Sequence, residues 1–516
     1  MGIRPSESSS GQRPRNVRPG LIAAGVLLTL AAMAAILPRV GHARVKGSDR
    51  SLTILAGSTG ISRGTGYPVL QRPPLYSAFL ALLGGAAGTP PSPTVDAARE
   101  FGNIRRLPVA KAYLKPSFLR VVLIGQTILF LGTIALVVAS LRVAGCSPRL
   151  RTFAAVLLLA IPNTWLGVGE VWDSSLTQFL LAASVAALSF VVSRRAGILS
   201  VVVAGTCLSL AGLSHATFQL LAPTVAVGLL LLSRFRGDTK GFLRAAAVIA
   251  GIWILLVGGW SVRNLRCCGF VGVSAVAGST LGTRTATYLE EALPAYPEEV
   301  SMFLRLRQET IAASPEHSGL LWAGPAVRWL METRGLDYVQ ANALLLRVNL
   351  AAIRRAPLNY LLTVSESVVS FLWTITTASL GPLRPLFAAA DLSLLALFLG
   401  VTALWLSYHF LPRLTGESPR RFEAMDGLIV LLLIVFWYAA AVFCGVDVGK
   451  PQQRASVQFV MPALVALGLS RLSGRTAHGG AGPAPSHDGG TEGTVSRPAA
   501  PSRAAPRAAG PPWPPG

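Results

Sequence analysis

Residues 427–445 read GLIVLLLIVFWYAAAVFCG, an apolar run without a charged side chain. About twenty consecutive apolar residues are what a helix needs to cross the hydrocarbon core of a bilayer. Similar runs recur along most of the 516-residue chain, in which 52% of residues are hydrophobic, 13% are charged and the mean hydropathy is +0.54. Because a soluble protein has about 25% charged residues, the sequence predicts an all-α, polytopic membrane protein.

We predict about ten or eleven transmembrane helices. Leu21–Leu37 is interpreted as an uncleaved first span, because it is too long for a typical signal-peptide core and lacks a small-residue cleavage site. The later spans are predicted at 118–141, 152–168, 174–192, 197–213, 217–233, 243–262, 388–409, 427–445 and 456–472.

Short basic loops follow alternate spans and set the predicted topology. Their residues are Arg142, Arg149 and Arg151; Arg194 and Arg195; Arg234, Arg236, Lys240 and Arg244; and Arg413, Arg420 and Arg421. The positive-inside rule places such loops in the cytoplasm, together with both termini. The long segments 41–117 and 263–360 then lie outside the plasma or inner membrane. The net charge of +23 comes from scattered clusters, so nucleic-acid binding is not indicated.

The polar ends and one unusual apolar run complete the domain plan. Residues 1–20 and 473–516 are expected to be disordered cytoplasmic tails around a transmembrane domain at 21–472. Residues 358–375 are apolar but contain Glu366, whose unpaired carboxylate would be costly in lipid. We therefore expect an interfacial helix on the outer side.

Cysteine and histidine show no metal or redox pattern. The five cysteines and six histidines are scattered, and the adjacent Cys267 and Cys268 are interpreted as structurally incidental. One or two carboxylates are too few to define a site for a divalent cation. No metal ligand or cofactor is assigned, and a role for a divalent cation stays open.

The first outer segment carries a candidate site. It contains Asp49 near the membrane surface and continues to Arg72-Pro73-Pro74-Leu75-Tyr76, followed by the apolar stretch Phe79–Leu83. The two prolines predict an extended, rigid start to that stretch. A lone Asp in a loop is usually a cap or a solvated charge, so the role of Asp49 depends on this context.

This order resembles the first outer loop of GT-C membrane glycosyltransferases, in the branch related to glycosyltransferase family 39, which includes protein O-mannosyltransferases and lipid A aminoarabinose transferases. Those proteins typically carry an Asp after the first span, a Gly-Tyr or Gly-Phe, and a Pro-Pro-Leu-Tyr-Pro element. Here Gly66-Tyr67 matches, while Ser77 replaces the last Pro and Leu52 replaces a Tyr that usually follows the Asp.

Further elements of the resemblance follow in the same order over about residues 20–472. Gln126 lies in Gly-Gln-Thr, and Glu170 lies in Gly-Glu-Val-Trp-Asp-Ser. Residues 259–264 read GWSVRN, where relatives carry Pro-Trp-x-x-Arg-Asn. Arg454 falls where relatives carry an Arg-Tyr-Arg-x-Pro signature, which here reads Gln-Arg-Ala-Ser.

The resemblance implies transfer of a sugar from a polyprenyl-phosphate-linked donor to a glycolipid, polysaccharide or protein acceptor at the outer face of the membrane. Such a reaction needs a carboxylate base for the acceptor and cations for the phosphate leaving group. It implies catalytic roles for Asp49 and Glu170. The implied substrate-binding residues are Arg263, Asn264, Asp173, Tyr76, Arg72, Lys111, Lys115 and Arg454.

Simpler interpretations stay open for several of these residues. Glu170 and Asp173 could mark the end of a span, Arg263 could be an interfacial arginine, and Lys111 and Lys115 could be ordinary surface charges. A transporter or flippase for a lipid-linked or anionic solute is the alternative function, although neither broken spans nor symmetric halves are visible. An inactive relative that acts as an assembly partner is a third reading.

Overall fold

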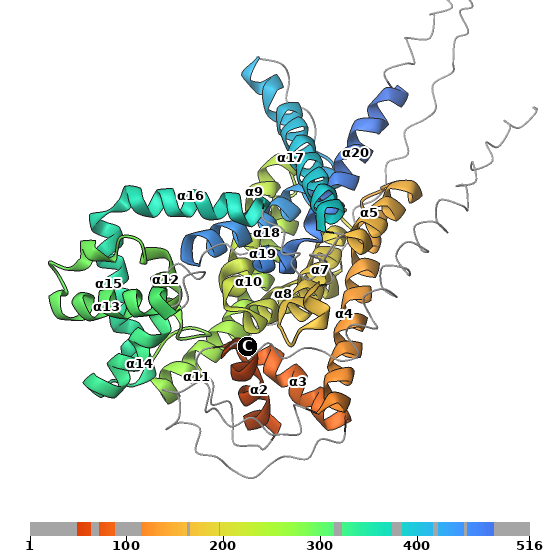
Figure 1. Ribbon diagram of the computed structural model, residues 1–516. Coiled ribbons are helices and arrows are strands. Elements are labelled where there is room, and N and C mark those ends of the chain that lie inside the picture. The colour runs from red at the N-terminus through yellow and green to blue at the C-terminus, as the bar shows by residue number, and fades with distance from the viewer. Residues whose placement is uncertain are drawn as a thin grey trace, which may run out of the picture. The chain divides into compact units, whose positions relative to one another are not determined.

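The computed structural model describes residues 49–62, 72–87, 115–161, 166–195, 197–313, 322–373, 384–415, 422–447 and 451–478. Every regular element in these ranges is a helix, as Figure 1 shows, which confirms the all-α prediction. The predicted first span and most of both predicted tails lie outside the described residues. Contacts divide the chain into a unit that ends at Leu472 and a second unit from Ser473.

Six described helical segments are long and apolar enough to cross a membrane, which confirms a multi-pass membrane protein. They are α4 (Pro116–Val143), α7 (Ser174–Val192), α9 (Leu221–Arg236) with the 3₁₀ turn before it, α10 (Thr239–Trp253) continued through α11 (Gly259–Cys268), α17 (Arg384–Leu414) and α18 (Ala424–Val446). Shorter apolar helices are α3 (Pro74–Ala86), α8 (Ile198–Ser214) and the segment Ala455–Arg471, which includes most of α20 (Val460–His478).

One predicted span ends earlier than expected. The apolar run 152–168 forms α5 (Pro148–Ala160), and Ile161 has extended backbone angles. Pro162 follows in the sequence, and a residue before proline is disfavoured in the helical conformation. The segment then resumes as a 3₁₀ turn at Leu166–Gly169.

Helix α7 is the centre of the bundle. Within its apolar window 78% of residues are buried, against 28% for α4 and 22% for the α10–α11 span. The outward side chains of α4 include Ile124, Ile128 and Leu131, which suit contact with lipid. Asp173 immediately precedes the first residue of α7, so one candidate site residue lies at the end of the central helix.

The segment that the sequence predicted as the first outer loop contains a helix. Helix α2 (Asp49–Ser62) packs against α3 and buries Ile54 and Leu55. The Ser77 hydroxyl donates a hydrogen bond of 3.0 Å to the Ile54 carbonyl oxygen. Most helical stability in proteins comes from such packing, which local sequence does not display.

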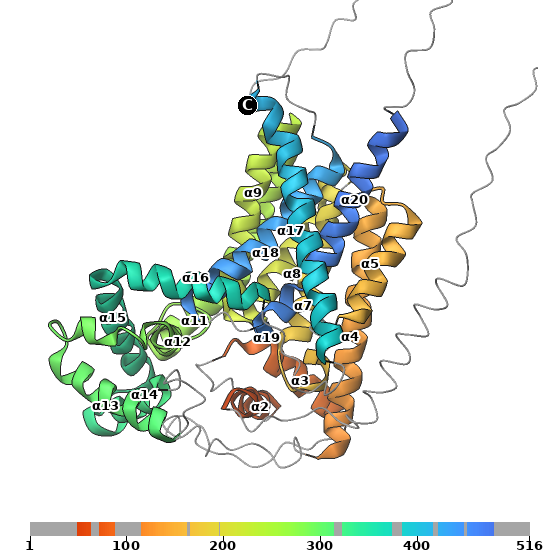
Figure 2. The same cartoon turned by 45° about the horizontal axis from the view of Figure 1, so that its top comes forward.

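The segment that the sequence predicted as the second outer loop forms a folded helical subdomain. It consists of α12 (Ala277–Thr285), α13 (Pro297–Ala313), α14 (Ala323–Arg334) and α15 (Tyr338–Arg355), which lie together in Figures 1 and 2. Its own apolar core includes Leu289, Phe303, Trp322, Leu330 and Leu345. The subdomain leads into α16 (Pro357–Trp373), which runs crosswise to α9 and α17 in Figure 2.

Buried Arg284 joins this subdomain to the bundle. Its guanidinium donates to the Thr363 carbonyl oxygen at 2.6 Å and the Ser367 hydroxyl at 2.5 Å, both in α16. It also donates to the Cys444 carbonyl oxygen in α18 at 2.5 Å. One side chain of α12 therefore fixes the positions of two other helices.

Helix α16 has the character of the interfacial helix that the sequence predicts. Leu358, Leu361, Leu362 and Val369 are all exposed, and the last three follow Leu358 by three, four and eleven residues. Its opposite side buries Ser367 and Phe371. An apolar stripe on one face of a helix that lies across the bundle is suited to the membrane surface.

Candidate active site

Three separate sequence motifs meet through buried hydrogen bonds. The Tyr76 hydroxyl of α3 donates to Gln126 Oε1 of α4 at 2.8 Å. Gln126 Nε2 in turn donates to the carbonyl oxygens of Val168 at 2.8 Å and Glu170 at 2.9 Å. Tyr76 is 1% exposed and Gln126 is 0% exposed. The side chain of Gln126 thus fixes the backbone of Glu170 relative to the Pro-Pro-Leu-Tyr element.

The proline pair places Tyr76 as the sequence predicts. Pro73 has φ −63° and ψ 153°, which is extended, and Pro74 is the first residue of α3. The backbone N–H of the first residue of a helix has no partner within the helix, so proline, which lacks this N–H, fits there without losing a hydrogen bond. The ring of Tyr76 then packs on Phe79 with a centroid distance of 5.8 Å.

Asp173 lies beside this network at the start of α7 and is 2% exposed. Burial raises the pKa of the Tyr76 phenol, and the charge of Asp173 raises it further. The Asp173 carbonyl oxygen accepts from the Thr177 hydroxyl at 2.8 Å, and the hydroxyl oxygens of Thr177 and Ser214 lie 3.0 Å apart, at hydrogen-bond distance. The structure therefore brings Tyr76, Glu170 and Asp173 together.

The Trp-x-x-Arg-Asn motif forms a second set of contacts. Arg263 lies 4.8 Å from the ring centroid of Trp260 and donates to Asn264 Oδ1 at 2.9 Å. Asn264 Nδ2 donates to the Gly272 carbonyl oxygen at 2.7 Å and is 2% exposed. Asn264 therefore orients the guanidinium and holds the returning chain after Gly269, which adopts φ +74°.

Apolar packing connects the two sets. Leu75, next to Tyr76, packs on a cluster that contains Val257 and Val273 and is also flanked by Trp260. A π turn at Ile254–Gly258 precedes α11, and such turns are frequent at functional sites. The Pro-Pro-Leu-Tyr and Trp-x-x-Arg-Asn motifs thus share one region of the bundle.

The remaining predicted cations differ in their surroundings. Burial raises the pKa of Tyr338 in α15 to about 12, and the Arg72 charge acts in the opposite direction. Because such an effect requires proximity, Arg72 lies near Tyr338. The segments 41–117 and 263–360 therefore approach each other at these two residues. Lys115 precedes α4 and is exposed. Lys111 lies outside the described residues.

Asp49 is the first residue of α2. Its side chain lies outside the description, so its role as a base stays a prediction. Among the residues that the structure describes, no group of three or more His, Cys, Asp or Glu could hold a metal ion.

Arg454 is held inside the bundle by an acid that sequence reasoning missed. Its guanidinium pairs with the carboxylate of Asp391 and donates to the Leu372 carbonyl oxygen. Gln458 Nε2 donates to the other Asp391 oxygen at 3.1 Å. The side chains of Arg454 and Asp391 are 0% and 4% exposed. The sequence did contain a signal for this pair: Asp391 lies inside the predicted span 388–409. A charged residue within a span is costly unless it is paired.

We predict that Tyr76→Phe weakens the candidate site without changing its shape. The variant removes the hydroxyl and leaves Gln126 Oε1 buried without its donor, which costs about 1–3 kcal/mol of stability. Thermal unfolding of detergent-solubilised protein measures this loss. The matched control is Tyr296→Phe, which removes a hydroxyl from the helical subdomain. Equal stability of Tyr76→Phe and wild type would contradict the assigned network.

Comparison with known proteins identifies the fold. No protein-family profile matches the chain. No curated protein sequence matches it either. The apo oligosaccharyltransferase of Archaeoglobus fulgidus is similar, with a TM-score of 0.50 and 15% identity over 89% of this chain and 51% of that one. This chain therefore spans about half the length of the archaeal enzyme.

Two further solved structures are similar at lower scores. The archaeal oligosaccharyltransferase AglB from Archaeoglobus fulgidus, in complex with an inhibitory peptide and a dolichol-phosphate, has a TM-score of 0.48 and 14% identity over 90% of this chain and 52% of that one. ArnT from Cupriavidus metallidurans, bound to undecaprenyl phosphate, has a TM-score of 0.35 and 14% identity over 90% and 79% of the two chains. The fold of this protein is therefore similar to that of the archaeal oligosaccharyltransferase, which confirms the predicted GT-C-like fold class.

Proposed function

We propose that this protein is a membrane glycosyltransferase that moves a sugar from a polyprenyl-phosphate donor to an acceptor at the outer face of the membrane. The observation that carries the proposal is the hydrogen-bonded set of Tyr76, Gln126 and Glu170. These residues come from three collinear motifs that resemble those of GT-C enzymes, in a chain with the GT-C fold.

The proposed reaction needs a base for the acceptor. Asp49 is the proposed base, because the resemblance places a catalytic Asp after the first span. Glu170 is the second carboxylate, and its backbone is fixed by Gln126 at 2.9 Å. A positioned carboxylate can accept the proton of an attacking hydroxyl or amine as the new bond to the sugar forms.

The leaving phosphate needs a cation, and Arg263 is the proposed residue. Its Nη1 donates to Asn264, and the side chain is partly exposed. A guanidinium has five N–H donors in a planar fork, a geometry that suits bidentate contact with a phosphate. The ring of Trp260 and the amide of Asn264 hold it in one orientation.

The proposed acceptor is a glycolipid, polysaccharide or protein. Arg72 lies near Tyr338 of the helical subdomain, so the first outer segment and the subdomain lie against each other. This contact supports a site that the two outer segments close together. Enclosure of a charged reaction strengthens its electrostatic interactions, because water is excluded.

Cells that lack this protein test the function. We expect the polyprenyl-phosphate sugar donor to accumulate and one glycan to lose a sugar, both measured by mass spectrometry against wild type. Cysteine labelling of Ser301→Cys from outside, and no labelling of Arg195→Cys, establishes the proposed orientation. Unchanged lipid-linked sugars and glycans would contradict the enzyme, and uptake defects without a glycan change would favour the transporter.

We predict that Arg263→Lys does not restore the function lost in Arg263→Ala. Lysine keeps the charge but replaces a bidentate fork by a point charge. Loss of one charged phosphate contact costs about 1.5–3 kcal/mol, which should appear as a higher KM for the donor.

Arg266→Lys is the matched control, because Arg266 is an exposed arginine in the last turn of the same helix. If membranes that contain Arg263→Ala show the wild-type KM for the donor, Arg263 does not bind the donor phosphate and serves only as an interfacial residue.

A further inference from the structure

A pocket of about 250 Å³ lies at the opposite end of α7 from the candidate active site. Its lining includes Arg194, Asp238, Phe242 and Arg244. Helix α7 begins after Asp173 and ends at Val192, and a helix of this length spans about 28 Å at 1.5 Å per residue. The pocket is therefore separate from the proposed site of sugar transfer.

The arginines that line the pocket suit the binding of an anion. Arg244 is exposed and has no ion pair or hydrogen bond among the residues that the structure describes. Arg194 donates to the Arg236 carbonyl oxygen at 2.6 Å, which orients its guanidinium. The acid at the pocket, Asp238, is already engaged: it accepts from the Gly241 N–H at 3.1 Å and lies 3.8 Å from Arg194 Nε.

Arg194 occupies a backbone position that normally favours glycine. It has φ +55°, the one positive value of a non-glycine residue among the described residues. The Arg194 N–H donates to Val191 and the Arg195 N–H to Phe190, which is the usual closure of a helix by a left-handed residue. An arginine where the backbone favours glycine suggests that its side chain has a function.

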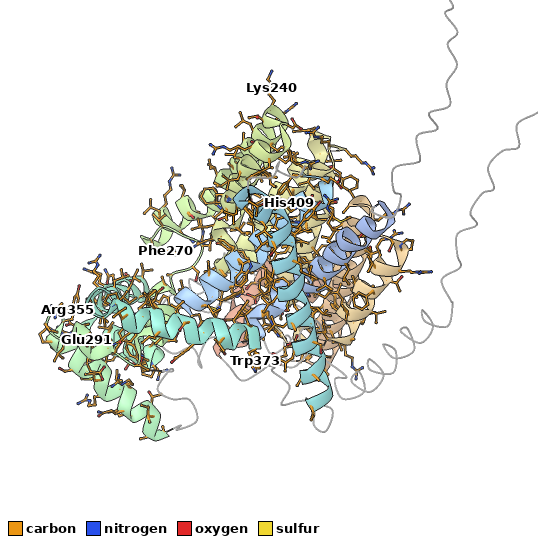
Figure 3. All side chains as sticks on the ribbon, turned by 90° about the horizontal axis from the view of Figure 1, so that it is seen from above. Lys240, Phe270, Glu291, Arg355, Trp373 and His409 are labelled. Carbon is orange, nitrogen blue, oxygen red and sulfur yellow. The ribbon has the colours of Figure 1, made fainter. Side chains whose placement is uncertain are left out.

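The other walls of the pocket are apolar. Val191, Val201 and Phe242 line it beside the arginines. Ile198 and Leu199, at the start of α8, are 51% and 72% exposed, which suits the boundary of the hydrocarbon core. A soluble phosphate would gain nothing from these walls, whereas a lipid would place its chain along them. Lys240, labelled in Figure 3, lies in the first turn of α10 next to the lining residue Gly241.

We propose that this pocket binds the phosphate headgroup of an anionic membrane lipid. Arg194 and Arg244 contact the phosphate oxygens, and the lipid chain runs along the apolar walls toward Ile198. This site goes beyond the proposed transferase reaction, because it lies at the other end of the bundle and uses none of its residues.

Binding of fluorescent phosphatidic acid to the detergent-solubilised full chain tests the proposal. Loss of one charged hydrogen bond weakens binding about 10-fold to 100-fold, so we expect this for Arg244→Ala and for Arg194→Gly. Glycine fits the left-handed backbone at position 194, so the second variant removes the side chain without straining the fold.

Matched controls are Arg234→Ala and Lys240→Ala. Both remove a positive charge from the same end of the bundle, but neither residue lines the pocket. We expect both to keep wild-type affinity. Equal weakening in the controls would show a general surface charge and overturn the site.

Competition by two other compounds distinguishes the possible chemical classes of the ligand. We expect phosphatidylcholine and inorganic phosphate each to displace the labelled lipid poorly. Strong competition by inorganic phosphate would assign the pocket to a soluble phosphate, and strong competition by phosphatidylcholine would show that the headgroup charge is not recognised; either result overturns the proposal. No sugar transfer is measured, so the outcome is independent of the proposed enzyme.

Discussion

Asp49→Asn is expected to lower the rate of sugar transfer about 10²–10⁴-fold, the usual contribution of a positioned base. Asparagine has nearly the same shape but cannot accept the acceptor's proton. Donor binding should survive, because the change adds no negative charge near a phosphate. The measurement is glycan transfer, normalised to the amount of membrane-inserted protein.

The control for this variant is Glu291→Gln, which neutralises an exposed acid of the helical subdomain, labelled in Figure 3. We expect it to transfer sugar at the wild-type rate. If Asp49→Asn also transfers at that rate, Asp49 is not the base, and Glu170→Gln becomes the next variant to test. A transporter or scaffold predicts a mild effect of both changes.

Asp391→Ala is expected to destabilise the protein by about 3–5 kcal/mol, because it leaves a buried charge without a partner. Arg454 is fully buried and pairs with this carboxylate, which Gln458 also contacts. Unfolding by denaturant in detergent, compared with wild type, measures the loss. Wild-type stability of this variant would contradict the buried pair.

A double variant separates the lost pair from lost packing. Asp391→Leu combined with Arg454→Met removes both charges and keeps similar volume, and such replacements are often neutral or stabilising. We expect it to recover most of the stability lost in Asp391→Ala. If the double variant is folded but transfers no sugar, Arg454 also serves the substrate, as the family resemblance implies.

Much of the helical bundle could be predicted because the length of an apolar run is a local property. The run 174–192 corresponds to α7 at Ser174–Val192, and the run 427–445 lies within α18. Helix α2 was missed, because it depends on burial of Ile54 against α3. The early end of α5 could have been anticipated from Pro162.

The site was predictable to the extent that its motifs are local. The Pro-Pro pair and Tyr76 could be named from the sequence, but the bond from Tyr76 to Gln126 joins residues 50 positions apart. The pairing of the buried arginines could not be assigned for the same reason, although the acid Asp391 within a predicted span was a signal that some partner exists. Arg454 and its partner Asp391 are 63 residues apart in the sequence, and Arg284 and Cys444 are 160 apart. No periodic pattern in the sequence connects residues so far apart.

The way in which Arg284 is held has a mechanical consequence. Its hydrogen bonds to Thr363 and Ser367 in α16, and to Cys444 in α18, join three helices at one point. Helix α16 presents an apolar stripe suited to the bilayer surface. A change in bilayer thickness that shifts α16 would therefore pull directly on α12. We therefore expect the helical subdomain to respond to the lipid composition of the membrane.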